Sequence, residues 1–257
     1  MDLLEYRDSE NKVRHPWETA RFEVMLRLLR NGFSKSDLNI ADIGCGDTFV
    51  VNSLAERYPK FKYLAVDSAF TDVDIDFFSK EFSDKNINLA KSVEAINGFT
   101  SKLDIVLLMD VIEHIENEVS FLQDVVKQDF IHKETLFLVT VPAFQSLFTA
   151  HDKHLLHYRR YSRKALVETL RESGLEIIDS GYFFTSLMKV RVLQKMLEKI
   201  FGEKEQKGLA EGDFDKKKAK LIKSFLLLDF KITRFFHQIG IQIPGLSTYA
   251  ICRKSLS

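Results

Sequence analysis

Short apolar runs alternate with segments of helical periodicity over most of the chain. The periodic segments predict helices at residues 17–29, 48–58, 76–82, 113–126 and 162–173. The apolar runs predict strands at residues 39–43, 61–66, 87–93, 103–109, 135–141, 175–182 and 247–253. Strands that are apolar throughout and alternate with helices indicate a mostly parallel sheet covered on both faces, which is a doubly wound α/β fold.

Residues 186–246 interrupt this alternation before the last predicted strand. They predict a helical insertion, a lid or subdomain, within a single domain of residues 1–257. Its helices are expected at 187–201 and 216–239, on either side of a polar stretch at 202–215. The second helix carries an apolar stripe at Leu221, Phe225, Leu228, Ile232, Phe235 and Phe236.

Lysines gather at the start of the second insertion helix. They are Lys216, Lys217, Lys218, Lys220 and Lys223. A basic amphipathic helix can lie on a membrane surface, so peripheral membrane contact through 216–239 is one interpretation. We favour the other, in which the stripe packs on the sheet domain or on a second copy of the chain, because Glu211, Asp213 and Asp215 offset the lysine charges. The protein would then be a monomer or a dimer.

The composition narrows the classes of function. Basic and acidic residues both number 37, and a net charge of zero argues against a nucleic-acid partner. The two cysteines, Cys45 and Cys252, cannot form a disulfide scaffold and lack zinc-site spacing, which favours a reducing compartment. No apolar run approaches the ~18 residues of a membrane span, and the N-terminal residues lack the core of a signal peptide. We therefore expect a cytoplasmic protein.

A glycine turn, Gly44 and Gly46, follows the first predicted strand and precedes a helix. Open parallel sheets bind ligands at the carboxyl ends of their strands, and glycine lets the backbone approach a ligand closely. The nicotinamide fingerprint requires a third glycine where this chain has Phe49, which argues against a dehydrogenase. Asp67 ends the second strand, 21 residues after Gly46, where a carboxylate can accept hydrogen bonds from both ribose hydroxyls. Alternatively, Asp67 and Asp42 only cap the turns that follow them.

Three segments, residues 39–47, 65–67 and 104–115, resemble the class I S-adenosylmethionine-dependent methyltransferases. The resemblance implies a Rossmann-like sheet of seven strands, the last one antiparallel, and S-adenosylmethionine as the cofactor. The cofactor-binding residues that it implies are Asp42, Gly44, Gly46, Asp67, Ser92 and Asp110. His114 is a further candidate, either for contact with the cofactor or for packing and capping beside it.

Three more segments resemble one bacterial branch of that superfamily, whose members mostly have no assigned substrate. They are residues 15–21, 141–162 and 182–184. The chain departs from these patterns at a few positions. Thr48 and Leu156 stand where the superfamily and the branch, respectively, often have glycine. Ser92 stands where the superfamily often has an acid for the adenine amine, with Glu94 in reserve.

The loop after the fifth predicted strand is dense in titratable and aromatic side chains. Pro142 ends that strand, so the next twenty residues lie over the carboxyl edge of the sheet. His157, and after it His151, are our candidates for a general base, because histidine titrates near neutral pH. The predicted substrate-binding residues are Asp152, Tyr158, Arg159, Arg160 and Tyr161. In the alternative, the arginines pair with surface acids and the histidines cap the loop.

Two further features of the site have competing interpretations. His151, His154 and His157 lie close enough in sequence to bind a metal with Asp152, but methyl transfer does not require one, so we predict no metal. The first helix, with Trp17 and Arg21, either folds over the cofactor or packs at the edge of the sheet.

Taken together, these patterns favour S-adenosylmethionine-dependent methyl transfer to a small molecule or a lipid- or carrier-linked metabolite. Oxygen is the acceptor atom that we expect, and nucleic acid is not an expected partner. The competing interpretation is a non-catalytic binding or regulatory module that keeps the cofactor pocket. The polar loop after the fifth strand argues against it.

Overall fold

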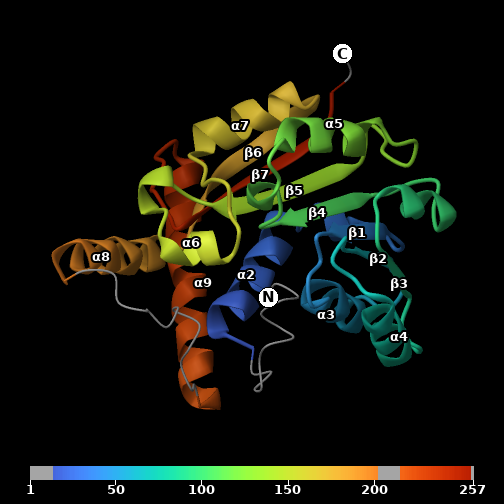
Figure 1. The fold of residues 1–257 in the computed structure, drawn as a ribbon, viewed down its shortest axis with the longest axis horizontal. Helices are drawn as coiled ribbons and strands as arrows, with labels where there is room; N and C mark the ends of the chain where they lie inside the picture. Colours follow the sequence, from blue (N-terminus) through green and yellow to red (C-terminus); the bar gives the residue numbers. More distant parts are fainter. Residues whose placement is uncertain (1–13, 202–214, 256–257) are drawn as a thin grey trace.

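A seven-stranded sheet organises the computed structural model, which describes residues 14–201 and 215–255 (Figure 1). The strands are β1 (Asn39–Ile43), β2 (Lys62–Val66), β3 (Ile87–Ala90), β4 (Ile105–Met109), β5 (Leu136–Pro142), β6 (Leu175–Phe183) and β7 (Ser247–Lys254). Their spatial order is β3-β2-β1-β4-β5-β7-β6, and β7 runs antiparallel to both of its neighbours. The predicted doubly wound sheet, with its antiparallel last strand, is confirmed.

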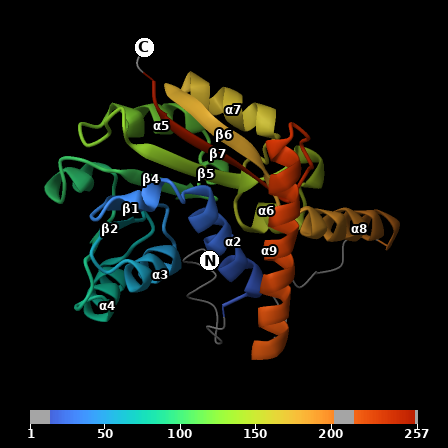
Figure 2. The same cartoon turned by 180° about the vertical axis from the view of Figure 1, so that it is seen from behind.

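Helices cover both faces of this sheet. They are α2 (Pro16–Leu28), α3 (Phe49–Arg57), α4 (Asp72–Glu81), α5 (Glu118–Lys127), α6 (Ala150–His154), α7 (Arg163–Glu172), α8 (Thr185–Phe201) and α9 (Lys216–Gln238). Successive strand residues point to opposite faces, so Leu107 packs in one core with α2, α3, α4 and α9. Its neighbour Leu108 packs in the other core with α5 and α7. Figures 1 and 2 display these two layers from opposite sides.

Three element boundaries differ from the sequence prediction by three residues or more. Helix α4 begins at Asp72, four residues earlier than expected, because Thr71 and Asp74 form a reciprocal capping box. The helix expected at 113–126 begins only at Glu118, where the Asn117 side chain accepts the Ser120 N–H at 3.2 Å. The preceding residues, Ile112–His114, form a separate 3₁₀ turn at the end of β4. The strand expected at 87–93 ends at Ala90.

Helices α8 and α9 connect β6 to β7, and α9 packs along α2 (Figures 1 and 2). The face that packs contains the buried residues Leu226, Phe230 and Thr233. The other stripe is not buried on the sheet domain, so of the two predicted packing alternatives only packing on a second copy of the chain stays a prediction. Its members Leu221, Phe225, Leu228, Ile232 and Phe235 are 49–72% exposed. The helix therefore has two apolar faces, of which the α2 packing uses one.

The polar stretch expected at 202–215 lies outside the described residues except for Asp215, which caps α9 by accepting the N–H groups of Lys217 and Lys218. Glu211, Asp213 and the N-terminal residues discussed above also lie outside the described residues. Among the helices that the structure describes, none combines the length and the apolar character needed to cross a membrane.

Candidate active site

The glycine turn after β1 lies against the ends of β2 and β4. Gly44 and Gly46 have φ angles of +73° and +54°, which glycine adopts at little cost. A Cβ on Gly44 would lie 2.6 Å from a methyl carbon of Val111, so close packing also requires glycine there. The Gly46 N–H donates to the Asp67 carboxylate at 2.8 Å. The glycine turn and Asp67, which the sequence analysis assigned to the same binding site, are therefore direct neighbours.

The two acids beside this turn differ in their surroundings. Asp67 also accepts the Ala69 N–H at 2.9 Å, which is the capping role considered as the alternative. Asp42 is buried at the end of β1. Burial raises the pKa of Asp42 to about 7, the Asp67 charge adds to this effect, and the Arg21 charge opposes it. A cation bound nearby would favour the ionised form of Asp42.

Helix α2 and the residue before it contact the segments that follow β1 and β4. Arg14, just before the helix, forms an ion pair with Asp47 at 2.5 Å and lies over the Phe49 ring. Arg21 forms an ion pair with Asp110 and stacks on Trp17. The first helix is thus tied to the glycine turn and to the end of β4.

Asp110 follows β4 in a left-handed conformation, with φ of +60°. Its backbone N–H donates to the Thr140 carbonyl at 2.9 Å, and its carboxylate accepts the Thr140 hydroxyl at 3.1 Å. By contrast, Ser92 lies exposed, two residues beyond the end of β3, with its hydroxyl on the Glu94 carboxylate. This bond and the Glu94 backbone N–H lower the pKa of Glu94.

The loop after β5 is organised around Asp152, which lies in the short helix α6 and is fully buried. Its carboxylate accepts the Thr149 N–H at 2.8 Å and the Arg160 Nε–H at 2.7 Å, and lies 3.1 Å from Nδ1 of His157. Burial alone would raise the pKa of Asp152, but the hydrogen bonds from His157 and Arg160 lower it below its ordinary value. An ionised carboxylate therefore holds His157 in place.

The other predicted substrate-binding residues have internal partners or face outward. Arg159 forms an ion pair with Glu118, and Arg160 is held by Asp152. Both arginines thus pair with acids, as in the alternative interpretation, but Asp152 is buried and is not the surface acid that this alternative expected. Tyr161 is buried, whereas Tyr158 is half exposed and its N–H donates to the Glu113 carbonyl at 2.8 Å. The last bond attaches the loop to the turn after β4. Binding of substrate by these residues stays a prediction.

Of the three loop histidines, only His157 reaches the end of β4. His151 is half-buried, and its burial together with the Arg191 charge lowers the pKa of its ring. His154 is exposed. The metal-binding trio considered from the sequence, His151, His154 and His157, is not the group that the structure assembles.

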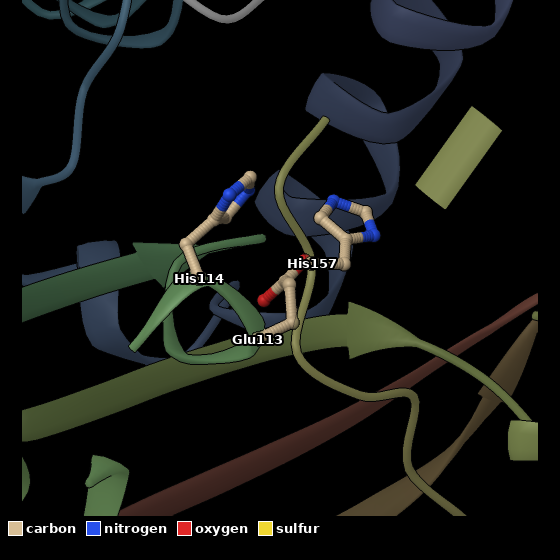
Figure 3. A group of neighbouring side chains, drawn as sticks. All are labelled: Glu113, His114 and His157. Atoms are coloured by element: carbon tan, nitrogen blue, oxygen red, sulfur yellow. The ribbon is translucent and has the colours of Figure 1, made fainter. Parts of the chain in front are cut away.

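A group that the sequence analysis missed lies where the loop meets β4. Glu113, His114 and His157 point toward one another (Figure 3), with one ligand atom of each within 4.8 Å of the others. The two imidazole rings are 4.5 Å apart and nearly perpendicular. Glu113 is 0% exposed, and among the residues that the structure describes neither of its carboxylate oxygens has a hydrogen-bond partner. Burial and then the Asp110 charge raise the pKa of Glu113 well above its ordinary value. The adjacent pair Glu113-His114, a few residues after the end of β4, was the available signal.

No family model matches the chain. The ubiquinone biosynthesis O-methyltransferase of Rickettsia bellii is 26% identical over 124 residues, which cover 48% of this chain and 50% of that protein. The protein of the same name from Rickettsia conorii is 32% identical over 124 residues, 47% of this chain and 39% of its own length. A tRNA U34 carboxymethyltransferase of Sulfurimonas denitrificans is 25% identical over 129 residues, 45% and 44% of the two chains. The chain thus spans about half the length of the curated relatives that it matches, or less.

Solved structures match most of the chain. Coclaurine N-methyltransferase superposes with a TM-score of 0.54 and 13% identity over 91% of this chain and 70% of its own. The plantazolicin methyltransferase BamL gives 0.55 and 15%, over 97% and 87%. The chain has the class I methyltransferase fold. The [4+2]-cyclase SpnF, at 0.58 and 13% over 96% and 86%, has the same fold, so this fold alone does not fix a reaction.

Backbone conformation explains why glycine is common at two positions where this chain has other residues. Thr48 and Leu156, which stand at expected glycine positions, both have left-handed backbones, with φ of +62° and +58°. Glycine adopts this region freely, whereas a β-branched threonine does so at a steric cost. The methyltransferase turn and loop therefore keep the backbone geometry that glycine would favour without having glycine.

Proposed function

We propose that this chain transfers a methyl group from S-adenosylmethionine to an oxygen acceptor. The observation that carries the proposal is the glycine turn of β1, bonded to Asp67 and adjoining the buried Asp42, at the carboxyl edge of a methyltransferase fold. Coclaurine N-methyltransferase and BamL were both solved with the demethylated cofactor bound, and the Rickettsia relatives are named O-methyltransferases. All of these names support the reaction class, and the Rickettsia names support oxygen as the acceptor atom.

The residues at the turn fit such a cofactor. Gly44 and Gly46 carry no side chain that would keep a ligand from the backbone, and Asp67 offers carboxylate oxygens for ribose hydroxyls. Asp42 suits the positively charged methionine end, because a cation favours the ionised form of a carboxyl whose pKa is about 7. When bound, the cofactor supplies an electrophilic methyl group on a sulfonium.

His157 is the proposed general base. Its Nδ1 lies 3.1 Å from the ionised Asp152, an arrangement that keeps the proton on Nδ1 and leaves Nε2 to accept one. As the acceptor hydroxyl loses its proton to Nε2, its oxygen forms the bond to the methyl carbon. The electrons of the broken carbon–sulfur bond remain on sulfur. The Asp152–His157 pair would thereby orient the base and stabilise its charged form.

A lipid- or carrier-linked acceptor has support from the insertion. The exposed stripe of α9 is apolar, and lysines lie at its start. A cavity of about 360 Å³ beside Phe235 is lined by four cationic side chains, Arg27, Arg30, Lys231 and Arg234. Apolar residues next to cations match an anionic bilayer surface, so we assign this face to peripheral membrane contact.

The deciding experiment measures methyl transfer and cofactor binding separately. We expect S-adenosylmethionine to raise the melting temperature and Asp67→Ala to remove most of that shift, since ligand at a hundred times its Kd stabilises by about 2.7 kcal/mol. Candidate phenols and hydroxylated lipids are then tested for a mass gain of one methyl group. Binding without turnover on any acceptor would favour the non-catalytic module, and stabilisation by nicotinamide dinucleotides instead would contradict the proposal.

A further inference from the structure

The Glu113, His114 and His157 group has the composition of a metal site. One carboxylate and two imidazoles, with ligand atoms within 4.8 Å of one another, converge where the 3₁₀ turn after β4 meets the loop after β5 (Figure 3). The loop is fixed there by the bond from the Tyr158 N–H to the Glu113 carbonyl. This backbone hydrogen bond holds the two segments that carry the three side chains against each other.

Glu113 provides a second, independent observation. A buried polar group without a hydrogen-bond partner costs free energy, and protein interiors rarely contain one. Glu113 is 0% exposed, yet both carboxylate oxygens have no partner among the described residues. A cation between the carboxylate and the two imidazoles would satisfy these oxygens.

The support around His157 is that of a metal-binding histidine. Such histidines usually donate their other ring N–H to a carboxylate, which fixes the tautomer and orients the ring. Here Nδ1 of His157 faces Asp152 at 3.1 Å, so Nε2 is the nitrogen left for a metal. Each of the two nearby cations has an acidic partner, Arg21 with Asp110 and Arg160 with Asp152, which reduces their repulsion of a bound metal ion.

We infer that Glu113, His114 and His157 bind a divalent transition-metal cation at the carboxyl edge of the sheet. Two imidazoles with one carboxylate suit zinc, manganese, iron or cobalt better than magnesium or calcium, which prefer oxygen ligands. This inference departs from our expectation from the sequence that the chain binds no metal, which stays untested.

The consequence for substrate class rests on the proposed methyl transfer. A cation beside Asp110 and His114 would bind the acceptor oxygen and lower its pKa, which points to a hydroxyl acceptor. With a metal bound, Nε2 of His157 would be a ligand and could no longer act as the base of the proposed function, so the hydroxyl proton would pass to water instead. The ionised oxygen then attacks the methyl carbon, and the carbon–sulfur electrons stay on sulfur.

The test uses the full chain, stripped with a chelator and then titrated with Zn²⁺ by calorimetry and with Co²⁺ by absorption spectroscopy. We expect one ion per chain, and a loss of affinity of at least ~100-fold for Glu113→Gln and for His157→Gln, since even outer-shell changes cost 10- to 100-fold. The matched control is His154→Gln, an exposed histidine of the same loop. Wild-type protein without a stoichiometric site, or equal affinity in Glu113→Gln, would overturn the inference.

Folding of the variants is checked by their melting temperatures without metal. We expect Glu113→Gln to melt no lower than wild type, because it replaces an unpaired buried acid with a neutral group of similar shape. If this variant fails to fold, His157→Gln decides the outcome. Metal binding without methyl transfer would refute the proposed function and leave the site standing, whereas metal-independent transfer by protein that binds no ion would do the reverse.

Discussion

The carboxyl edge of the sheet and helix α9 depart from ordinary protein surfaces in opposite directions. At the edge, acids such as Asp42, Asp152 and Glu113 are buried, and Asp152 is held by a full set of donors. On α9, large apolar side chains such as Leu221 and Phe225 face solvent. Burying acids and exposing large apolar side chains both cost free energy. A bound cation would reduce the first cost at the edge, and contact with an apolar surface would reduce the second at the helix.

The largest expected effect tests the edge. His157→Gln should reduce methyl transfer by about 100- to 10,000-fold, the range typical of a lost general base, while S-adenosylmethionine still stabilises the protein. Turnover is measured at saturating cofactor and compared with His154→Gln, which we expect to behave like wild type. Equal losses in both variants, or a loss explained entirely by unfolding, would contradict a role for His157 in the chemistry.

The next effect tests the helix. Wild-type protein should sediment with vesicles that contain anionic lipid, and the double change Phe225→Glu with Leu228→Glu should weaken this binding more than tenfold. Burying each side chain contributes about 1.5–3 kcal/mol, and 1.4 kcal/mol is already tenfold. Both residues are exposed, so the fold should tolerate the change.

The matched control for the helix is Val73→Glu with Phe77→Glu, an exposed apolar pair on α4. We expect it to leave vesicle binding unchanged. A second copy of the chain is the competing occupant of the stripe. If ultracentrifugation finds a wild-type dimer that the α9 change dissociates, and vesicles bind neither protein, the membrane assignment is wrong.

A smaller effect separates the two acids of the glycine turn by pH. The pKa of Asp42 is about 7 in the folded chain against 3.8 as the ordinary value, so between these values only the folded chain keeps the proton. Stability therefore falls as pH rises from about 4 to 7. Asp42→Asn removes this dependence and should be more stable relative to wild type at pH 8 than at pH 5, by at most about 3 kcal/mol.

Urea unfolding at the two pH values measures the Asp42 difference. Asp67→Asn serves as the comparison, because the same turn is changed at an acid that accepts two backbone N–H groups. A difference between wild type and Asp42→Asn that is the same at both pH values would argue against a protonated Asp42.

The smallest expected effect concerns the two left-handed residues. Thr48→Gly and Leu156→Gly should each stabilise the protein by about 1 kcal/mol, because glycine removes the steric cost of φ near +60°. Thermal melts detect such a change. Thr169→Gly in the middle of α7 is the control and should destabilise, since the helical backbone there does not favour glycine. A destabilised Thr48→Gly would mean that its hydroxyl, which donates to the Asp47 carbonyl, contributes more than the strain costs.

The fold and the glycine turn were predictable because their signals are local. A strand, a glycine turn and a helix are adjacent in sequence, and Asp67 follows the next strand, so the parallel sheet brings Gly46 and Asp67 together. Partners chosen across loops were not predictable. Nothing local indicates that Arg159 pairs with Glu118, 41 residues away, or that Glu113 faces His157.

The packing face of helix α9 was not predictable for a different reason. Its sequence has two apolar faces, one through Leu221 and Phe225 and another through Leu226 and Phe230. Periodicity identifies both but cannot say which one meets α2, because that depends on shape complementarity with a helix 200 residues away in sequence. The sequence analysis did not identify the face through Leu226 and Phe230 as the one that packs within the chain.

The position of β7 between β5 and β6 affects how the chain can be made. During synthesis, β5 and β6 leave the ribosome well before β7 (Ser247–Lys254). Until β7 emerges, each of the two strands has an unpaired edge at the place that β7 will occupy. Unpaired edges are the sites where partly synthesised chains associate wrongly. Protease protection of β5 and β6 in stalled nascent chains should therefore appear only once Lys254 has left the exit tunnel. Completion of the sheet thus waits for the synthesis of β7.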